Sequence, residues 1–255
     1  GLYLIKDDIR NPVTFFVENK NGNNAIQSFY DMGETENELF FTSNNCNVWR
    51  YNKLEKKFNL LKLPTSSQIM YVLFLSDQQV FFTTADDGFL TYNLSNRTVE
   101  HYKSATHSAL INNEIEYAYM DSHKEIWIQP KGKGIVHFHP FKKELVYYPP
   151  VNESITHSRL FIHEDVEQRL WIQPRGVPFS YYDRENKKLI PFYEKKDSQV
   201  DWEVSDGLMG VCSDSQGNLW LSSNYRGLEK ATFRNELFQV HSVGEVALEN
   251  NTRMV

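Results

Sequence analysis

The sequence has few cysteines, no long apolar run and no excess of positive charge. Only Cys46 and Cys212 are present among 255 residues. They lie far apart, at non-equivalent positions of the repeat described below, and we expect two buried free thiols. No stretch of about 18 apolar residues occurs, so no membrane-spanning helix is predicted within this chain. The formal net charge of −6 disfavours a phosphate-binding surface, and we expect no contact with nucleic acid.

Motifs for catalysis and for metal binding are also scarce. Neither a Gly-x-Ser-x-Gly nucleophile motif nor a phosphate-binding glycine loop occurs. His137 and His139 alternate on a predicted strand, so their side chains should share one face, but no third ligand is indicated and we expect an ordinary surface strand. The aspartates that open the predicted turns have too few oxygen ligands around them for calcium. We therefore expect no metal, no cofactor and no catalytic residue in this chain.

Aromatic residues are abundant, with 17 Phe and 5 Trp, and many of them belong to a repeating pattern. The clearest copy covers residues 214–241. Polar turns at 214–217 and 224–227 enclose a short strand centred on Trp220, and two further apolar–polar segments follow. With residues 208–213 as a preceding strand, the unit is a four-stranded meander. Such a sheet has apolar faces that it cannot bury alone, so further copies are expected.

Four further copies precede this one. Residues 165–193 follow the same plan around Trp171, residues 121–148 follow it around Trp127, and two weaker copies upstream are centred on Phe. The five aromatic markers recur at intervals of 41 to 49 residues, as expected where core strands repeat and linking loops differ in length. In the three Trp copies an aspartate stands six residues before the Trp. The repeat positions are Phe40, Phe81, Trp127, Trp171, Trp220, Asp121, Asp165, Asp214, Gly217 and Gly227.

We expect structural roles for these repeat positions. The aromatic markers are predicted to pack between blades, and the aspartates to accept backbone N–H groups within the turns. The pattern predicts an all-β fold, a β-propeller of tandem four-stranded blades with five full repeats and a partial one. The predicted blades, within a single propeller fragment of residues 1–255, are 1–20 (partial), 26–63, 69–103, 115–149, 160–194 and 208–242, with 243–255 as a tail or the start of another blade.

The partial blade has two interpretations. A propeller often closes by pairing its two chain ends in one sheet, which would complete a sixth blade here. Alternatively, the chain is a piece of a longer array. We favour the longer array, because no residues near Val255 supply the Trp-centred strand that should precede Gly1.

The pattern also resembles a known family. Residues 214–228 read Asp-x-x-Gly-Asn-Leu-Trp-Leu-x-Ser-x-x-x-Gly-Leu, which closely resembles the two-component regulator propeller repeat, and residues 121–135 and 165–182 resemble it less closely. That repeat builds the periplasmic sensor region of hybrid two-component histidine kinases in carbohydrate-degrading gut bacteria. The resemblance implies a non-catalytic, periplasmic sensor fragment whose ligand is an oligosaccharide. It also implies neighbouring propeller and β-sandwich domains, a homodimeric parent protein, and a kinase module outside this chain.

Propeller geometry predicts where a ligand would bind. The loops between second and third strands, and the crossings between blades, emerge on one face around the central channel. Basic and aromatic side chains there would suit carboxylated or sulfated sugars, through bidentate hydrogen bonds and ring stacking. Ordinary solvated loop charges are the alternative. The predicted site residues are Lys131, Lys133, Arg175, Asn224, Tyr225, Arg226, Asn113, His157 and Asp206.

Three functions fit these observations. The first is a sensor propeller that binds an oligosaccharide and passes the signal to the kinase module. The second is a structural or dimerisation propeller that binds no small ligand. The third is a propeller lyase or glycosidase, which needs paired carboxylates or a His/Tyr/Arg cluster at the axis. The inward strands offer mainly Glu114, Glu116 and Tyr117, so we expect the chain not to be an enzyme.

Overall fold

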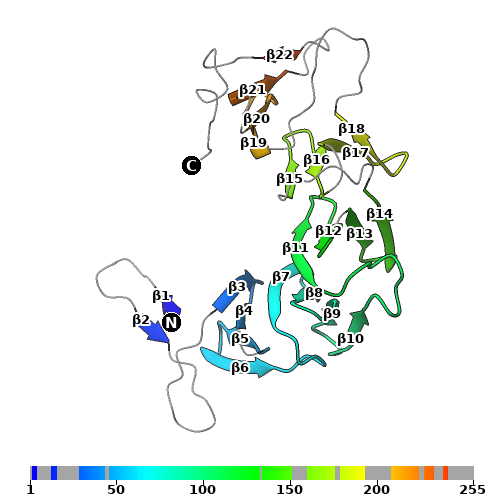
Figure 1. Ribbon diagram of the computed structural model, residues 1–255. Helices are drawn as coiled ribbons and strands as arrows, with labels where there is room; N and C mark the ends of the chain where they lie inside the picture. The colour runs from blue at the N-terminus through cyan, green and yellow to red at the C-terminus, as the bar shows by residue number, and fades with distance from the viewer. Residues whose placement is uncertain are drawn as a thin grey trace. The chain divides into compact units, whose positions relative to one another are not determined.

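Every element in the described part of the chain is a β-strand (Figure 1). The structure is a computed structural model that describes residues 2–4, 13–15, 29–43, 46–132, 134–150, 160–175, 179–192, 208–223, 227–232 and 238–240. Within these residues no helix is long and apolar enough to cross a membrane. The chain forms two compact units, residues 1–118 and 119–255.

The first unit contains one pair of strands and two four-stranded sheets. β1 (Leu2–Leu4) pairs antiparallel with β2 (Val13–Phe15). The two larger sheets have the orders β3-β4-β5-β6 and β7-β8-β9-β10, so each is a meander of consecutive strands. Their strands are β3 (Phe29–Glu34), β4 (Glu38–Ser43), β5 (Val48–Asn52), β6 (Lys57–Leu61), β7 (Ile69–Ser76), β8 (Gln79–Thr84), β9 (Phe89–Asn93) and β10 (Val99–Tyr102).

Three further sheets with the same strand order follow, and β11, the first strand of the first one, spans the boundary between the units. The strands are β11 (Ile115–Met120), β12 (Ile126–Pro130), β13 (Ile135–His139), β14 (Glu144–Tyr148), β15 (Phe161–Glu164), β16 (Leu170–Gln173), β17 (Ser180–Asp183), β18 (Lys188–Pro191), β19 (Leu208–Ser213), β20 (Leu219–Ser223), β21 (Gly227–Ala231) and β22 (Phe238–Val240). All pairings for which a register is defined are antiparallel.

The middle strands of the sheets are buried on both faces. Every residue of β12 and β13 is buried, whereas β14 is half-buried or exposed. Strands β8 and β9 are likewise almost entirely buried. A lone four-stranded sheet cannot bury both faces of its middle strands, so each sheet must pack between neighbours.

Three of the five aromatic markers, Phe40, Trp127 and Trp171, lie at these contacts between sheets. The side chains of Phe40, Phe81 and Trp127 are 0% exposed and that of Trp171 is 2% exposed, whereas Trp220 is half-buried. In the first unit, one cluster joins Phe40 and other residues of sheet β3–β6 to residues of sheet β7–β10. In the second unit, Trp127 packs with residues of sheet β15–β18, and Trp171 packs with residues of sheet β19–β22. Burial of apolar area at about 25 cal/mol per Å² stabilises each contact.

An aspartate fixes the turn before each Trp-centred strand and also holds the Trp. Asp121 Oδ1 accepts hydrogen bonds from the backbone N–H groups of His123 and Glu125, both at 3.0 Å, and Oδ2 accepts one from Trp127 Nε1 at 3.1 Å. Asp165 and Asp214 make the same three kinds of bond with the residues two, four and six positions later. The carboxylate therefore orders the turn and sets the orientation of the ring that packs against the next sheet.

The fourth residue of this turn has left-handed backbone geometry in all three copies. The φ angles are 62° at Lys124, 60° at Gln168 and 80° at Gly217. Only glycine adopts this conformation without a steric penalty from a Cβ atom. A Cβ added at Gly217 would meet Val166 Cγ2 at 3.6 Å, an ordinary contact, so the penalty there is conformational rather than a clash.

The two cysteines differ in part from expectation. Both are free, as predicted, but Cys46 and Cys212 are half-buried rather than buried. Cys46 lies in a loop with a φ of 62°, and Cys212 pairs with Trp220 on a first strand. The strand that contains Cys212, β19, lies at the end of its sheet and pairs with β20 alone.

Exchanging the turn residues should change stability in opposite directions. Gln168→Gly should raise the free energy of unfolding by about 0.5–1 kcal/mol, because it removes a left-handed non-glycine residue. Gly217→Gln should lower the free energy of unfolding by about 1 kcal/mol for the same reason. Urea unfolding followed by tryptophan fluorescence measures both. Changes of the same sign in the two variants would contradict the explanation.

Candidate functional site

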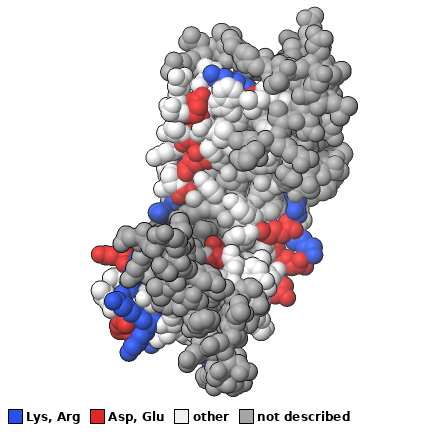
Figure 2. All heavy atoms as spheres, turned by 90° about the vertical axis from the view of Figure 1, so that its left-hand side faces the viewer, with Lys and Arg blue, Asp and Glu red and all other residues white. Residues whose placement is uncertain are grey.

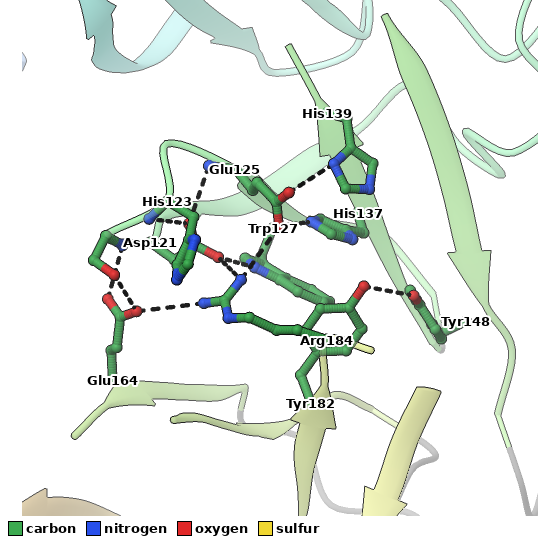
Figure 3. Close-up of polar contacts among 11 residues, drawn as sticks. Asp121, His123, Glu125, Trp127, His137, His139, Tyr148, Glu164, Tyr182 and Arg184 are labelled. Carbon is green, nitrogen blue, oxygen red and sulfur yellow. Dashed lines mark hydrogen bonds and ion pairs between the residues drawn. The ribbon is translucent and has the colours of Figure 1, made fainter. Parts of the chain in front are cut away.

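A polar cluster lies between sheet β11–β14 and sheet β15–β18, and all of its residues belong to the second unit (Figure 3). Glu125 directly precedes β12, both histidines lie on β13, Glu164 ends β15, and Arg184 follows β17. We call this group the inter-blade cluster. Its members are Asp121, Glu125, His137, His139, Glu164 and Arg184.

One carboxylate in the cluster contacts two imidazoles. Trp127 pairs with His137 across β12 and β13, and the alternation of side chains along β13 puts His139 on the same face. His137 Nε2 lies 3.0 Å from Glu125 Oε2, and His139 Nδ1 lies 2.8 Å from Glu125 Oε1 (Figure 3). His137 is 0% exposed and His139 is 7% exposed. The facing nitrogen and oxygen atoms of the three residues lie within 4.8 Å of one another.

Burial determines the charge of His137. Its ring stacks on Trp127 with a centroid distance of 4.0 Å and an interplanar angle of 6°. Desolvation, together with the charges of His139, Arg184 and Lys187, lowers the pKa of His137 to about 3. The nearby Glu125 carboxylate favours the charged ring, but these effects outweigh it. His137 is therefore neutral near pH 7 and donates its Nε2 proton to Glu125.

Arg184 connects the two sheets through three carboxylates. Its Nη1 lies 3.2 Å from Asp121 Oδ2 and 3.3 Å from Glu125 Oε2, and its Nη2 lies 3.4 Å from Glu164 Oε1. Glu164 also accepts hydrogen bonds from the backbone N–H and the hydroxyl of Ser122, at 2.8 and 2.7 Å. The contacts run from one sheet to the other, so this network aligns neighbouring blades in addition to the apolar packing.

Two tyrosines close the side of the cluster next to Arg184 (Figure 3). The Tyr148 hydroxyl has a single proton to donate, and its oxygen lies 3.4 Å from Tyr182 Oη and 3.2 Å from the Lys187 carbonyl oxygen. Desolvation raises the pKa of both tyrosines. Both hydroxyls therefore stay protonated near pH 7 and do not act as bases.

The sequence-based expectation for the two histidines was wrong. His137 and His139 do not lie on a surface strand, and Glu125 provides the third side chain that the sequence did not indicate. The register of the β12–β13 hairpin indicates that Glu125 is this third side chain. Trp127 pairs with His137 and Ile126 with Phe138, so the next step along the hairpin places Glu125 opposite His139.

The structure brings together the loops of two predicted site residues. Gly134, in the loop that contains Lys131, donates its backbone N–H to the carbonyl of Arg175 at 2.7 Å. Lys131 is exposed and Arg175 is half-buried. The loops after β12 and after β16 are therefore neighbours on one side of the second unit, which is the arrangement that a shared anion site requires.

Of the other predicted site residues, the structure describes only Asn113. Asn113 is half-buried in the first unit, where its side chain accepts the Ser104 N–H at 2.7 Å and its carbonyl accepts the Gly88 N–H at 2.9 Å. Asn113 thus stabilises a crossing loop. Six further predicted residues lie outside the described residues: Lys133, His157, Asp206, Asn224, Tyr225 and Arg226.

The described charges do not gather into a broad positive region on the face in Figure 2. On this face, Lys and Arg lie in small groups among Asp and Glu, wherever the side chains are described. On this face the described side chains therefore offer an anion individual Lys and Arg residues, not a large basic field.

A second group of ligand-type side chains lies on the first strands of the first unit. Tyr71 on β7 and Tyr117 on β11 make an edge-to-face contact with ring centroids 5.9 Å apart. Tyr117 is 38% exposed, and Tyr30 and Met32 on β3 are 52% and 60% exposed. Desolvation raises the pKa of Tyr71 and of Tyr117. Exposed tyrosine rings on first strands are suited to stacking on a sugar ring or on an apolar group.

Neither a protein-family model nor a curated protein matches the sequence, but solved structures do. The extracellular domain of the hybrid two-component system BT4673 from B. thetaiotaomicron is similar over 94% of this chain and 31% of its own length, with 17% identity and a TM-score of 0.58. The extracellular domain of the hybrid two-component system BT3049, from the same organism, is similar over 93% of this chain and 32% of its own length, with 12% identity and a TM-score of 0.58. The chain therefore spans about a third of the length of these domains.

Virginiamycin B lyase from Staphylococcus aureus is also similar, over 80% of this chain and 67% of the lyase, with 14% identity and a TM-score of 0.55. At such identities the likeness shows the fold alone. The chain is an all-β propeller built from four-stranded blades, and the prediction of this fold is confirmed. The resemblance of the repeat to sensor propellers agrees with the two extracellular domains.

Removing Arg184 should weaken the contact between the two sheets. Arg184→Met keeps much of the side-chain volume but leaves the buried Asp121 carboxylate and the half-buried Glu164 carboxylate without this cation. We expect the free energy of unfolding to fall by about 2 kcal/mol. Lys142→Met, at an exposed position of the hairpin after β13, should change it by less than about 0.5 kcal/mol. Equal effects of the two substitutions in urea unfolding would contradict a bridging role for Arg184.

Asp165 should make stability depend on acid pH. Desolvation raises its pKa, but hydrogen bonds from Trp171 and Arg169 and the charge of Arg169 outweigh this and hold the pKa of Asp165 below its ordinary value. A carboxylate with a lowered folded-state pKa contributes stability that is complete above its unfolded-state pKa of about 4 and is lost as the pH falls through its folded-state pKa.

Asp165→Asn should therefore destabilise the protein at pH 7 and make the loss of stability below pH about 4 less steep than in the original chain. Urea unfolding at a series of pH values measures both effects. The matched control is Asp77→Asn, at an exposed turn. A pH profile of Asp165→Asn that is parallel to that of the original chain would show that Asp165 contributes nothing to acid sensitivity.

Proposed function

We propose that this chain is a non-catalytic propeller segment of the sensor region of a hybrid two-component signalling protein, located in the periplasm. The likeness in fold to the extracellular domains of such systems supports the proposal, and so does the resemblance of residues 214–228 to the sensor repeat. The parent protein would contain further propeller and β-sandwich domains, a histidine kinase module and a second copy in a homodimer. The chain itself would bind or relay the signal.

The proposed ligand is an oligosaccharide, and two surfaces of the chain suit different sugars. The neighbouring loops of Lys131 and Arg175 suit a carboxylated or sulfated sugar, because a guanidinium group can form paired hydrogen bonds with an anion. The exposed rings of Tyr117 and Tyr30 suit a neutral sugar, which binds through ring stacking. The two surfaces can be distinguished by the charge of the sugar that binds.

Signalling by such a segment requires that the ligand bind two arrangements of the parent protein with different affinity. A ligand with equal affinity for both arrangements shifts nothing, however tightly it binds. The inter-blade contacts are the interactions within this chain that such a shift would alter. If no ligand binds, the segment is a structural or dimerisation propeller.

The likeness to virginiamycin B lyase supports a second candidate, a propeller lyase. This function needs a base and charged groups that converge at the substrate. Incubation of the chain with quinupristin, the compound named with one lyase structure, followed by mass spectrometry, tests it. Turnover would favour the lyase and would reject the non-catalytic proposal.

Calorimetry against neutral and anionic oligosaccharides tests the sensor proposal. If an anionic sugar binds, Lys131→Glu with Arg175→Glu should weaken its binding by roughly 10-fold or more, because charge-assisted hydrogen bonds are lost. If a neutral sugar binds, Tyr117→Ala should weaken it by a similar factor. Lys142→Glu, on the hairpin after β13, is the control for surface charge. No binding across the panel would reject this chain as the ligand-binding segment, and binding that all of these variants retain would reject the two proposed surfaces.

A further inference from the structure

The inter-blade cluster contains three side chains that the proposed sensor function does not use. We propose that Glu125, His137 and His139 form a binding site for a divalent transition-metal cation of the zinc type. This inference is independent of the sensor proposal, because it depends only on groups within sheet β11–β14 and their contacts with the next sheet.

The donor atoms are the right kind and lie close together. Two imidazole nitrogens and one carboxylate are a frequent ligand set for Zn²⁺ and for related cations such as Fe²⁺ and Co²⁺. One donor atom from each of Glu125, His137 and His139 already lies within 4.8 Å of the others, and both imidazoles point toward the Glu125 carboxylate (Figure 3). Two nitrogen donors disfavour Mg²⁺ and Ca²⁺, which prefer oxygen ligands.

The same three positions in the other sheets do not provide such a set. The position two residues before the aromatic marker is Glu38, Gln79, Glu125, Arg169 or Asn218, in chain order. The residue paired with the marker is Arg50, Thr91, His137, Tyr181 or Lys230. In sheet β3–β6 the first two positions form an ion pair with each other. There, Arg50 forms an ion pair with Glu38 and lies over the ring of Phe40.

The third position lies two residues after the residue that pairs with the aromatic marker, and here sheet β11–β14 differs from other sheets. Asn52, Asn93 and Asp183 occupy it in three other sheets, and each Oδ1 accepts two backbone N–H groups of the following turn. In sheet β11–β14 the residue is His139, whose ring contacts Glu125 instead. The sheet thus lacks the side-chain cap that three others use, and a buried imidazole beside a carboxylate takes its place.

The cluster also contains unsatisfied polar atoms. His137 Nδ1 and His139 Nε2 are buried and have no hydrogen-bond partner within the described residues. These are the ring nitrogens opposite the ones that face Glu125, so they do not themselves contact the proposed cation. When the facing nitrogens bind a cation, the ring protons move to these far nitrogens, so the two rings stay neutral. The slightly exposed His139 can then donate to water.

The surrounding charges favour a cation. The carboxylates of Asp121, Glu125 and Glu164 face the guanidinium of Arg184, and they outnumber the cationic groups even when the exposed Lys187 is counted. Arg184 competes for Glu125, but it can keep its contacts with Asp121 and Glu164 if Glu125 turns to a metal. Glu125 is 23% exposed in its side chain, so water can complete the coordination.

The test compares the untagged 255-residue chain with a variant that copies another of its own sheets. Glu125→Gln with His139→Asn reproduces the Gln79 and Asn93 pair of sheet β7–β10, so the variant should fold. Titration with Zn²⁺ alone, after removal of metal with a chelator, should show binding of one equivalent by the original chain. In the double variant the affinity should fall at least about 10-fold.

A second measurement distinguishes metal loss from misfolding. Zn²⁺ at about 100 times the Kd of the original chain should lower the unfolding equilibrium constant of that chain by about 100-fold, and that of the folded double variant by about 10-fold or less. The control is His101→Gln, because His101 lies 3.5 Å from Asp87 as a simple pair, and this variant should bind Zn²⁺ like the original chain. The proposal is overturned if the original chain binds no Zn²⁺, if the double variant binds it equally well, or if Ca²⁺ and Mg²⁺ bind with similar affinity.

Discussion

The packing of one sheet against the next, through an aromatic residue in its second strand, is the interaction on which the rest of this structure depends. Trp127 and Trp171 have almost no exposed surface because the following sheet covers them. The aspartate six residues earlier accepts the indole N–H and the N–H groups of the turn, so one side chain sets both the hairpin geometry and the face that packs. Repeating this unit buries both faces of the middle strands, which no single sheet could do.

The sequence predicted this architecture because its physical causes are local. The spacing of Trp220 from Asp214, and of the aromatic markers from one another, reports strand length and turn chemistry directly. The inter-blade cluster was not predicted, because it depends on pairing across a hairpin and on the next sheet. Glu125 and His139 are far apart in sequence and meet only through the register of β12 and β13, and Arg184 reaches Glu125 from the neighbouring sheet. Single-residue patterns do not contain that information.

The repeats differ from one another mainly at positions that the packing and the turn hydrogen bonds do not constrain. The marker aromatic and the turn aspartate are held by packing and hydrogen bonds, whereas the residue opposite the marker is Arg50, His137 or Lys230 in different sheets. A propeller can therefore keep its fold while individual blades acquire different chemistry. This accounts for the likeness of the same chain to sensor domains and to a lyase, and it directs attention to the variable positions rather than to the shared ones.

Native-state hydrogen exchange tests the central claim most directly, because it reports the protection of each strand. If the sheets are stabilised by stacking on their neighbours, the backbone N–H groups of β8, β12 and β16, each a second strand with buried faces, should exchange most slowly. Those of the partly exposed fourth strands β10, β14 and β18 should exchange faster. Equal protection of second and fourth strands, or faster exchange in the second strands, would contradict the account.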